Sequence, residues 1–230
     1  RRAQVKLGDF PIDAVWSPDG RALLVARGAG ALTWLDTTST APAPLRIGEH
    51  AGGALALAWQ SGGQQFASSG QDGEVRLWDA RVRSARVIHS SAIWSERLAW
   101  SGNGRALAVA TGRELCIYPS DGAARVQLPP QAGVIAAIAW RAKTSELASV
   151  GNGGAFVHRL EPEPVTRAYP WQGACLTASW SPDGRVLASG PSFNYQRVLP
   201  EATDVATTAV DNGDGTFTYT FASAIPAVYA

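Results

Sequence analysis

The chain has 230 residues, of which 46% are hydrophobic, and its 24 Gly and 14 Pro supply many turn-forming positions. The 20 Lys and Arg residues almost balance the 19 Asp and Glu residues, so the sequence lacks the basic surface that nucleic-acid binding usually requires. No apolar run approaches the roughly 20 residues needed to span a bilayer. We therefore expect short strands around a large core, and neither nucleic acid nor membrane among the partners.

Five tryptophans recur at a nearly constant interval: Trp16, Trp59, Trp100, Trp140 and Trp180 are separated by 43, 41, 40 and 40 residues. A four-stranded propeller blade occupies about 40–45 residues. Each of these tryptophans ends an apolar run and is followed by a turn segment, such as SPDG at 17–20. The period predicts blade units near residues 9–48, 49–90, 91–130, 131–170 and 171–198, and it leaves 199–230 as a non-repeat tail.

The segments within each unit fit four successive strands. First strands such as ALALAW are almost wholly apolar, as expected for inner strands covered on both faces. Third strands are expected around Leu32, Val75, Leu115 and Phe156, which follow the same period. Fourth strands such as ARVIHS carry more charge and suit an outer edge. Val5 and Leu7 are expected in a further outer strand before the first unit.

One segment carries a family resemblance. Residues 66–79, FASSGQDGEVRLWD, resemble a WD-repeat signature, and residues 9–197 are similar to bacterial WD-repeat proteins. The resemblance implies a β-propeller in which a His, a Ser, an Asp and a Trp form a hydrogen-bonded network. The matching positions here are His50, Ser68, Asp72 and Trp78. In three other units the Trp position holds Leu35, Tyr118 and Arg159, so we expect those blades to depend more on apolar packing.

The sequence gives no support to a catalytic or metal site. The histidines His50, His89 and His158 fall in different units without metal-ligand spacing, so a structural role is favoured. Cys116 and Cys175 lie 59 residues apart in apolar runs and suit buried free thiols. The sequence contains no CxxC, CxxCH or GxSxG motif. We therefore expect no enzyme, no cofactor and no metal.

Two glycine-rich segments are interpreted as turns. GNGG at 151–154 lacks the remainder of a phosphate-loop fingerprint. DNGDG at 211–215 superficially resembles a calcium loop, but it has Gly at the third and fifth positions, where a calcium loop needs oxygen side chains. A tight hairpin turn between Thr207–Val210 and Thr216–Phe221 is the better interpretation.

The end of the repeat region departs from the pattern. After Ser189 the segment PSFNYQRV has neither the DG turn nor the LWD-like ending of a third strand. The chain also lacks Met and begins with two arginines, so we expect a fragment whose start lies upstream, and an incomplete or open ring. Residues 206–230 locally resemble a β-domain segment of outer-membrane multihaem cytochromes. The segment contains no haem-binding cysteine, so this resemblance implies no functional site.

A local basic run, Arg81, Arg83 and Arg86, allows two interpretations. Charged residues on an outer strand discourage edge-to-edge pairing, and this interpretation is favoured. The alternative is a small patch for an acidic partner.

These observations predict an all-β WD-repeat propeller with a C-terminal β-hairpin, acting as a non-catalytic protein–protein interaction scaffold for a protein or peptide partner. The alternatives are an accessory propeller domain of a larger enzyme, or a fragment fused to a multihaem cytochrome-like segment. The cytoplasm is favoured as the location. Because interfaces are enriched in Trp, Tyr and Arg, the candidate partner-binding residues are Trp94, Arg97 and Trp171. Alternatively, both tryptophans simply pack beneath their loops.

Overall fold

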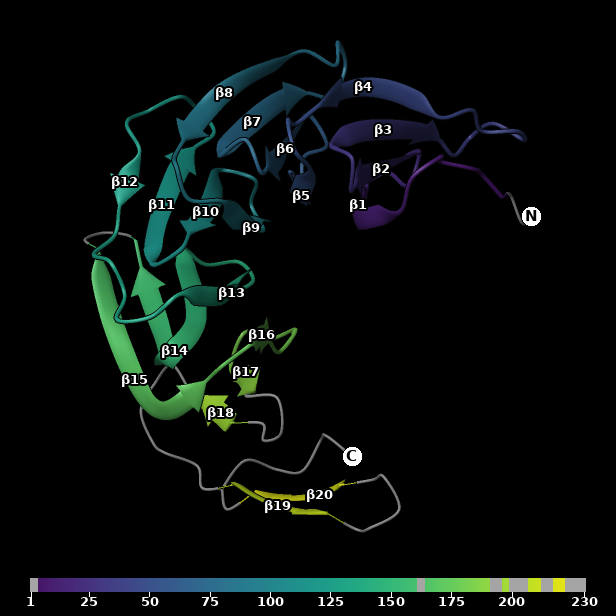
Figure 1. Cartoon of the computed structure of the whole chain (residues 1–230). Coiled ribbons are helices and arrows are strands. Elements are labelled where there is room, and N and C mark those ends of the chain that lie inside the picture. The colour runs from purple at the N-terminus through teal and green to yellow at the C-terminus, as the bar shows by residue number, and fades with distance from the viewer. Residues whose placement is uncertain (1–3, 161–163, 191–195, 199–206, 212–216, 222–230) are drawn as a thin grey trace.

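Small antiparallel sheets follow one another along an open arc in the computed structural model of the chain (Figure 1). The structure describes residues 4–160, 164–190, 196–198, 207–211 and 217–221. All the regular secondary-structure elements among these residues are strands. No helix long and apolar enough to cross a membrane occurs in this described part of the chain. The all-β expectation is confirmed.

Three sheets have four strands each, and every strand pairs with the next one along the chain. Blade 1 consists of β1 (Pro11–Trp16), β2 (Ala22–Arg27), β3 (Ala31–Asp36) and β4 (Leu45–Glu49). Blade 2 consists of β5 (Ala54–Trp59), β6 (Gln65–Gly70), β7 (Glu74–Asp79) and β8 (Ala85–Ser90). Blade 3 consists of β9 (Ser95–Trp100), β10 (Ala106–Thr111), β11 (Glu114–Pro119) and β12 (Val126–Gln127).

Two further sheets continue the arc, each with three strands among the described residues. Blade 4 consists of β13 (Ile135–Trp140), β14 (Glu146–Arg159) and β15 (Val165–Ala174). Blade 5 consists of β16 (Thr177–Trp180), β17 (Leu187–Gly190) and β18 (Gln196–Val198). A separate two-stranded sheet follows, made of β19 (Thr207–Asp211) and β20 (Phe217–Phe221).

The turns after the periodic tryptophans have a local chemical cause. The Ser17 hydroxyl donates to the Asp19 carboxylate at 2.6 Å, and the same carboxylate accepts the backbone NH of Arg21 at 3.0 Å. Gly20 completes the turn with a φ of 69°, which side-chain-bearing residues rarely adopt. Ser181 and Asp183 repeat the hydroxyl–carboxylate bond at 2.5 Å. The SPDG segments therefore reverse the chain between first and second strands, as the sequence predicts.

The hydrophobic core lies between blades. One cluster joins Leu24 and Leu32 of blade 1 to Phe66 and Trp78 of blade 2, and three more join the later pairs of blades. The Phe66 and Trp78 rings stack with centroids 5.5 Å apart, which adds about 0.5–1.5 kcal/mol to the gain from burying their area. Each blade therefore depends on its neighbour for a buried face.

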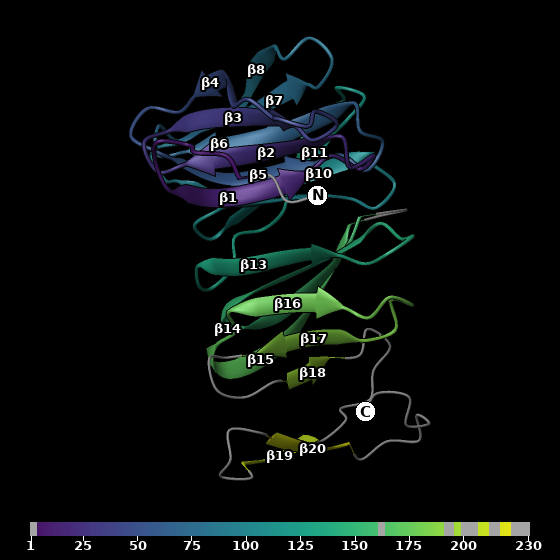
Figure 2. The same cartoon turned by 90° about the vertical axis from the view of Figure 1, so that its right-hand side faces the viewer.

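Neighbouring inner strands run in the same direction. The Trp140 indole donates to the carbonyl oxygen of Ala99 at 2.9 Å, and the Trp180 indole donates to that of Ala139 at 3.0 Å. Both bonds span 41 residues, so the register is the same at both blade boundaries. Figure 2 shows β1, β13 and β16 with their arrowheads toward the same side. The loops that precede the inner strands consequently lie on one face of the arc.

The ring is open, as the sequence predicts, because blades 1 and 5 stand at opposite ends of the arc (Figure 1). The expected outer strand at Val5 and Leu7 is wrong, since residues 4–7 form no strand. Such a strand would have to pair with the last blade, which is out of reach in an open arc. Instead, the guanidinium of Arg27 donates a hydrogen bond to the carbonyl oxygen of Leu7 and holds this segment.

Two boundaries differ from expectation in blade 4. Gly151–Gly154 was expected to be a turn outside the strands, but it lies within β14. Gly153 and Gly154 have φ values of 97° and 121°, so the chain reverses there while its flanks stay paired with β13 and β15. Strand β15 also extends to Ala174, past the unit boundary expected at residue 170.

The predicted hairpin in the tail is confirmed for its two strands. Thr207 pairs with Phe221 and Asp211 pairs with Phe217 in an antiparallel ladder. The turn between them, at 212–216, lies outside the described residues.

Candidate functional site

The four residues assigned to a network in blade 2 are hydrogen-bonded to one another. His50 precedes β5, Ser68 lies in β6, Asp72 in the turn before β7, and Trp78 in β7. The His50 Nδ1 atom is 2.9 Å from Asp72 Oδ1, and its Nε2 atom is 2.8 Å from Ser68 Oγ. The Trp78 indole donates to Ser68 Oγ at 2.9 Å. The network thus joins the loop before β5, strand β6, the turn before β7 and strand β7.

Each hydrogen-bond donor of this network has an acceptor when the His50 ring is neutral. Nδ1–H then donates to Asp72, while Nε2 accepts the Ser68 hydroxyl, whose oxygen accepts the Trp78 indole NH. Burial lowers the pKa of His50 and outweighs the opposing effect of Asp72. A neutral ring is therefore the form favoured in the folded state, and its hydrogen bonds hold the four residues together.

Asp72 connects this network to the loop before β5. Burial acts to raise the pKa of Asp72, but the hydrogen bonds from His50 and from the backbone NH of Glu74 lower it below the usual value. Its carboxylate also accepts the backbone NH of Ala51 at 3.2 Å and the guanidinium of Arg76 at 3.1 Å. The carboxylate thus fixes the loop that begins at His50 against the turn before β7.

Blade 4 contains a second network that sequence comparison with blade 2 missed. His158 Nε2 is 2.8 Å from Ser149 Oγ, and His158 Nδ1 is 2.9 Å from Thr166 Oγ1. Ser149 also accepts a hydrogen bond from the Gln131 amide. The sequence period placed Arg159 at the position of the network Trp. That prediction is wrong, because His158 and not Arg159 is bonded to Ser149. Burial lowers the pKa of His158 to about 4.

A third polar cluster joins His89 of β8, in blade 2, to blade 3. His89 Nδ1 is 2.8 Å from the Tyr118 hydroxyl, and Ser95 and Thr111 share a hydrogen bond of 2.6 Å. Burial is the main cause that lowers the pKa of His89, and the charge of Arg125 adds to it. The expectation that blades 3 and 4 depend on apolar packing was therefore incomplete, because each histidine anchors a buried hydrogen-bond cluster.

Exposed apolar side chains gather where the inner strands begin. They lie directly before β1, β9, β13 and β16, which belong to four different blades. Their exposed fractions are Phe10 68%, Ile93 60%, Trp94 45%, Val134 55% and Leu176 51%. We call this set the loop face. Since the inner strands run in the same direction, these residues lie on the same face of the arc, and blades 1 and 5, which carry Phe10 and Leu176, stand at its two ends.

The structure separates the three predicted partner-binding residues. Trp94 belongs to the loop face, and its exposure argues against packing beneath the loop. Arg97 lies within β9, where its Nε donates to the carbonyl oxygen of Ala136 at 2.5 Å and ties blade 3 to blade 4. Trp171 lies in β15 and not in a loop before an inner strand, and its side chain is outside the described part of the structure.

Phe10, Ile93, Val134 and Leu176 were not predicted from the sequence, and for the last three a signal was present. Their signal was the same period that marks the tryptophans, since they are separated by 41 and 42 residues. Other chemistry has little support in the described residues. No group of His, Cys, Asp and Glu there is arranged to hold a metal, and Cys116 and Cys175 are buried free thiols.

The sheets and their stacked inner strands make the fold an open β-propeller, and blade 2 contains the His–Ser–Trp–Asp network that the WD-repeat resemblance implies. Residues 44–79, from the last strand of blade 1 to the third strand of blade 2, match the family model described as "WD domain, G-beta repeat". This segment contains all four network residues.

Comparison with known proteins gives the same fold. Intraflagellar transport protein 80 homolog of Mus musculus is 26% identical over 209 residues, covering 84% of this chain and 26% of that protein. WD repeat-containing protein slp1 of Schizosaccharomyces pombe is 23% identical over 159 residues, covering 62% of this chain and 32% of that protein. A chain in the crystal structure of the mitotic checkpoint complex superposes with a TM-score of 0.58 at 21% identity, covering 85% of this chain and 77% of that one.

The chain therefore spans about a quarter to a third of the length of these curated relatives. The named relatives are eukaryotic, and they lend no support to the bacterial type expected from the sequence. They also lend none to the cytochrome likeness of residues 206–230.

Proposed function

We propose that this propeller arc is a non-catalytic scaffold that binds a protein partner through the loop face. The observation that carries the proposal is that exposed Phe10, Ile93, Trp94, Val134 and Leu176, from four blades, lie on the same face of the arc. Single exposed apolar residues are ordinary on protein surfaces, but a group from several repeats on one face is typical of an interaction site.

The loop face is suited to binding because its supports are fixed before a partner arrives. The Ser95–Thr111 hydrogen bond holds the residue that follows Trp94. A rigid surface loses little conformational entropy on association, so more of the gain from apolar burial remains as affinity. Trp94 is the expected centre of the contact, because interface hot spots are enriched in Trp.

The relatives support a protein partner. The structural neighbour is a chain of a multiprotein complex, the mitotic checkpoint complex, and the mouse relative is named for intraflagellar transport. Their particular partners are not carried over to this chain.

The test is affinity capture from a lysate of the source organism, with quantitative mass spectrometry. The wild-type chain is compared with the double variant Ile93→Ser, Val134→Ser. The matched control is Val82→Ser, Val126→Ser, which removes exposed valines (71% and 39% exposed) away from the loop face. We expect specific partners to be depleted at least about tenfold with the loop-face variant only. Equal recovery with wild type and loop-face variant would refute the proposal.

A further inference from the structure

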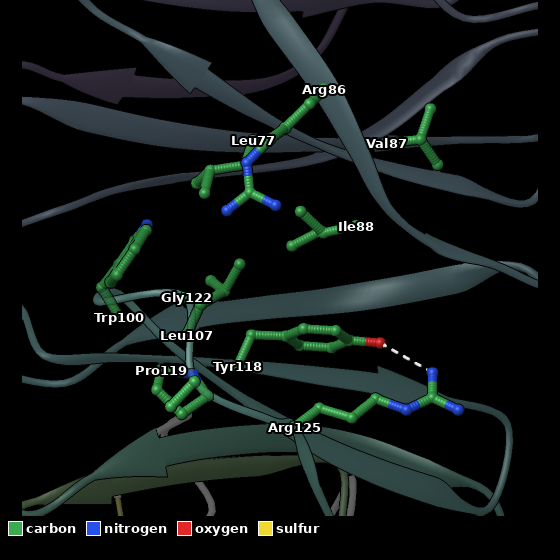
Figure 3. Close-up of a pocket in the computed structure, with 11 residues that line it drawn as sticks. Leu77, Arg86, Val87, Ile88, Trp100, Leu107, Tyr118, Pro119, Gly122 and Arg125 are labelled. Atoms are coloured by element: carbon green, nitrogen blue, oxygen red, sulfur yellow. Dashed lines mark hydrogen bonds between the residues drawn. The ribbon is translucent and has the colours of Figure 1, made fainter.

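A pocket of about 280 Å³ opens between blades 2 and 3. Figure 3 shows the side chains that line it. Its walls come from β7, the outer strand β8, the end of β9, β10, and the segment after β11. The lining residues used below are Leu77, Arg86, Ile88, Trp100, Tyr118 and Arg125. Because the lining residues come from strands about 40 residues apart, the pocket is a product of blade stacking.

The floor of the pocket is apolar and fixed. Leu77 and Leu107 are buried, and Ile88 and Trp100 are partly buried. The Tyr118 ring forms one wall, and its hydroxyl is held at 2.8 Å from His89 Nδ1. Binding pockets for whole drug-sized ligands measure about 300–1,000 Å³. This pocket therefore has room for one large side chain and the chain segment on either side of it.

The rim of the pocket is cationic. Arg86 has neither an ion pair nor a hydrogen bond from its side chain to any described residue. Arg125 donates to the Tyr118 hydroxyl at 3.2 Å, as Figure 3 shows, and forms no ion pair with a described carboxylate. Glu114, whose charge acts on Arg125, is hydrogen-bonded instead to Gln127. Two guanidinium groups thus stand beside an apolar floor without carboxylate partners.

The Trp100 ring also lines the pocket. Its indole NH is buried and, like that of Trp59, has no hydrogen-bond acceptor among the described residues. A ligand is therefore expected to pack against the Trp100 ring and not to pair with its NH.

We propose that this pocket binds a short peptide segment in which an apolar side chain is flanked by carboxylates. The apolar side chain packs on Leu77 and Ile88, and the carboxylates pair with Arg86 and Arg125 at the rim. The same apolar side chain also packs against the Trp100 ring. This inference rests on the proposed scaffold function and gives it a second, chemically defined contact.

Of the basic run Arg81, Arg83 and Arg86, one residue, Arg86, lines this pocket. Arg83 lies in the turn before β8, where its guanidinium is 4.6 Å from the centroid of the Trp34 ring. Arg81 lies in the same turn, and only Arg86 lines the pocket. The basic residues that line this pocket are two arginines, too few to follow a nucleic-acid backbone. A compact acidic and apolar ligand fits this site better.

The test titrates the ¹⁵N-labelled chain with the synthetic peptide acetyl-Ala-Glu-Leu-Glu-Ala-amide and follows the Trp100 indole NH resonance by NMR. Trp100→Phe assigns that resonance. We expect a saturable shift of the Trp100 resonance, with an affinity that falls as NaCl is raised. The peptide with Gln in place of both Glu residues should bind at least tenfold more weakly, and Arg86→Gln, Arg125→Gln should weaken the Glu peptide equally.

The matched control is Arg81→Gln, Arg113→Gln, which removes the same charge from exposed positions outside the pocket. Binding to this control should match the wild type. No shift at Trp100, or equal binding of the Glu and Gln peptides, would overturn the inference. Capture through the loop face is measured separately with Ile93 and Val134 variants, so either proposal fails without the other.

Discussion

The Trp140 indole donates to the carbonyl oxygen of Ala99 across the boundary between blades 3 and 4, at 2.9 Å. Trp180 repeats this bond one blade later, whereas the equivalent indole of Trp100 is buried without a partner. Tryptophans at the same position of the repeat therefore differ, because Trp140 and Trp180 donate a hydrogen bond to the preceding blade and Trp100 does not. This contrast allows the bond to be measured apart from the burial of the ring.

Trp140→Phe should destabilise the protein by about 1 kcal/mol more than Trp100→Phe. Both substitutions remove the same atoms from a partly buried ring, but only the first removes a hydrogen bond. Urea unfolding followed by circular dichroism gives the two free energies of unfolding. Equal losses would show that the bond between blades contributes nothing.

Asp72→Ala should lower the stability of blade 2 by about 1–3 kcal/mol, because it leaves His50 Nδ1–H and the NH of Ala51 without their acceptor. Trp78→Ala should cost at least as much, since it also removes the stacked ring on Phe66. Asp121→Ala, which loses only an exposed bond to the NH of Ala123, serves as the control. Thermal midpoints equal to that of the parent protein would disprove the structural role of the network.

Acid should begin to destabilise the protein below pH 6.5, before most carboxylates are protonated. The pKa of His158 is lowered to about 4 from its ordinary 6.5, so the unfolded chain takes up a proton in this window and the folded chain does not. Stability is therefore complete above pH 6.5 and is lost as the pH falls toward 4. For His158 alone the loss is up to about 3 kcal/mol.

His158→Gln should flatten the dependence of the free energy of unfolding on pH between these limits. Residual dependence should remain from His50 and His89, whose pKa values burial also lowers. The check is urea unfolding at half-unit pH steps. An unchanged slope in the variant would show that His158 is not buried as a neutral ring.

Much of the fold could be predicted from the sequence because Trp16 to Trp180 recur once per blade and each ends an inner strand. The network of blade 2 was accessible for a related reason, since all four residue types are present. The role of His158 was not, because the chain reversal at Gly153 and Gly154 changes the register between the second and third strands of blade 4. Sequence alignment by period cannot detect such a shift.

The sites were harder to predict for physical reasons. The loop face depends on residues that matter only once the inner strands are known to run in parallel. The pocket beside Arg86 and Arg125 combines side chains from two blades, and neither arginine is distinctive in its own segment. In both cases the stacking of blades, and not a local motif, makes the surface.

Removal of residues 201–230 should leave the blades folded. Strands β19 and β20 form a sheet of their own, so their loss breaks no ladder within a blade. Hydrogen exchange of residues 53–79 should be nearly unchanged in the truncated chain. Faster exchange throughout the inner strands of blades 2 to 4 would mean that the tail is part of the propeller.

The most direct test of the scaffold is hydrogen–deuterium exchange of the chain with and without a protein partner recovered by affinity capture. The account predicts that slowed exchange on binding is concentrated in the loops around Ile93 and Trp94, Val134, and Leu176, where the inner strands begin. Protection confined to the outer strands β4, β8 and β15, with these loops unchanged, would contradict it.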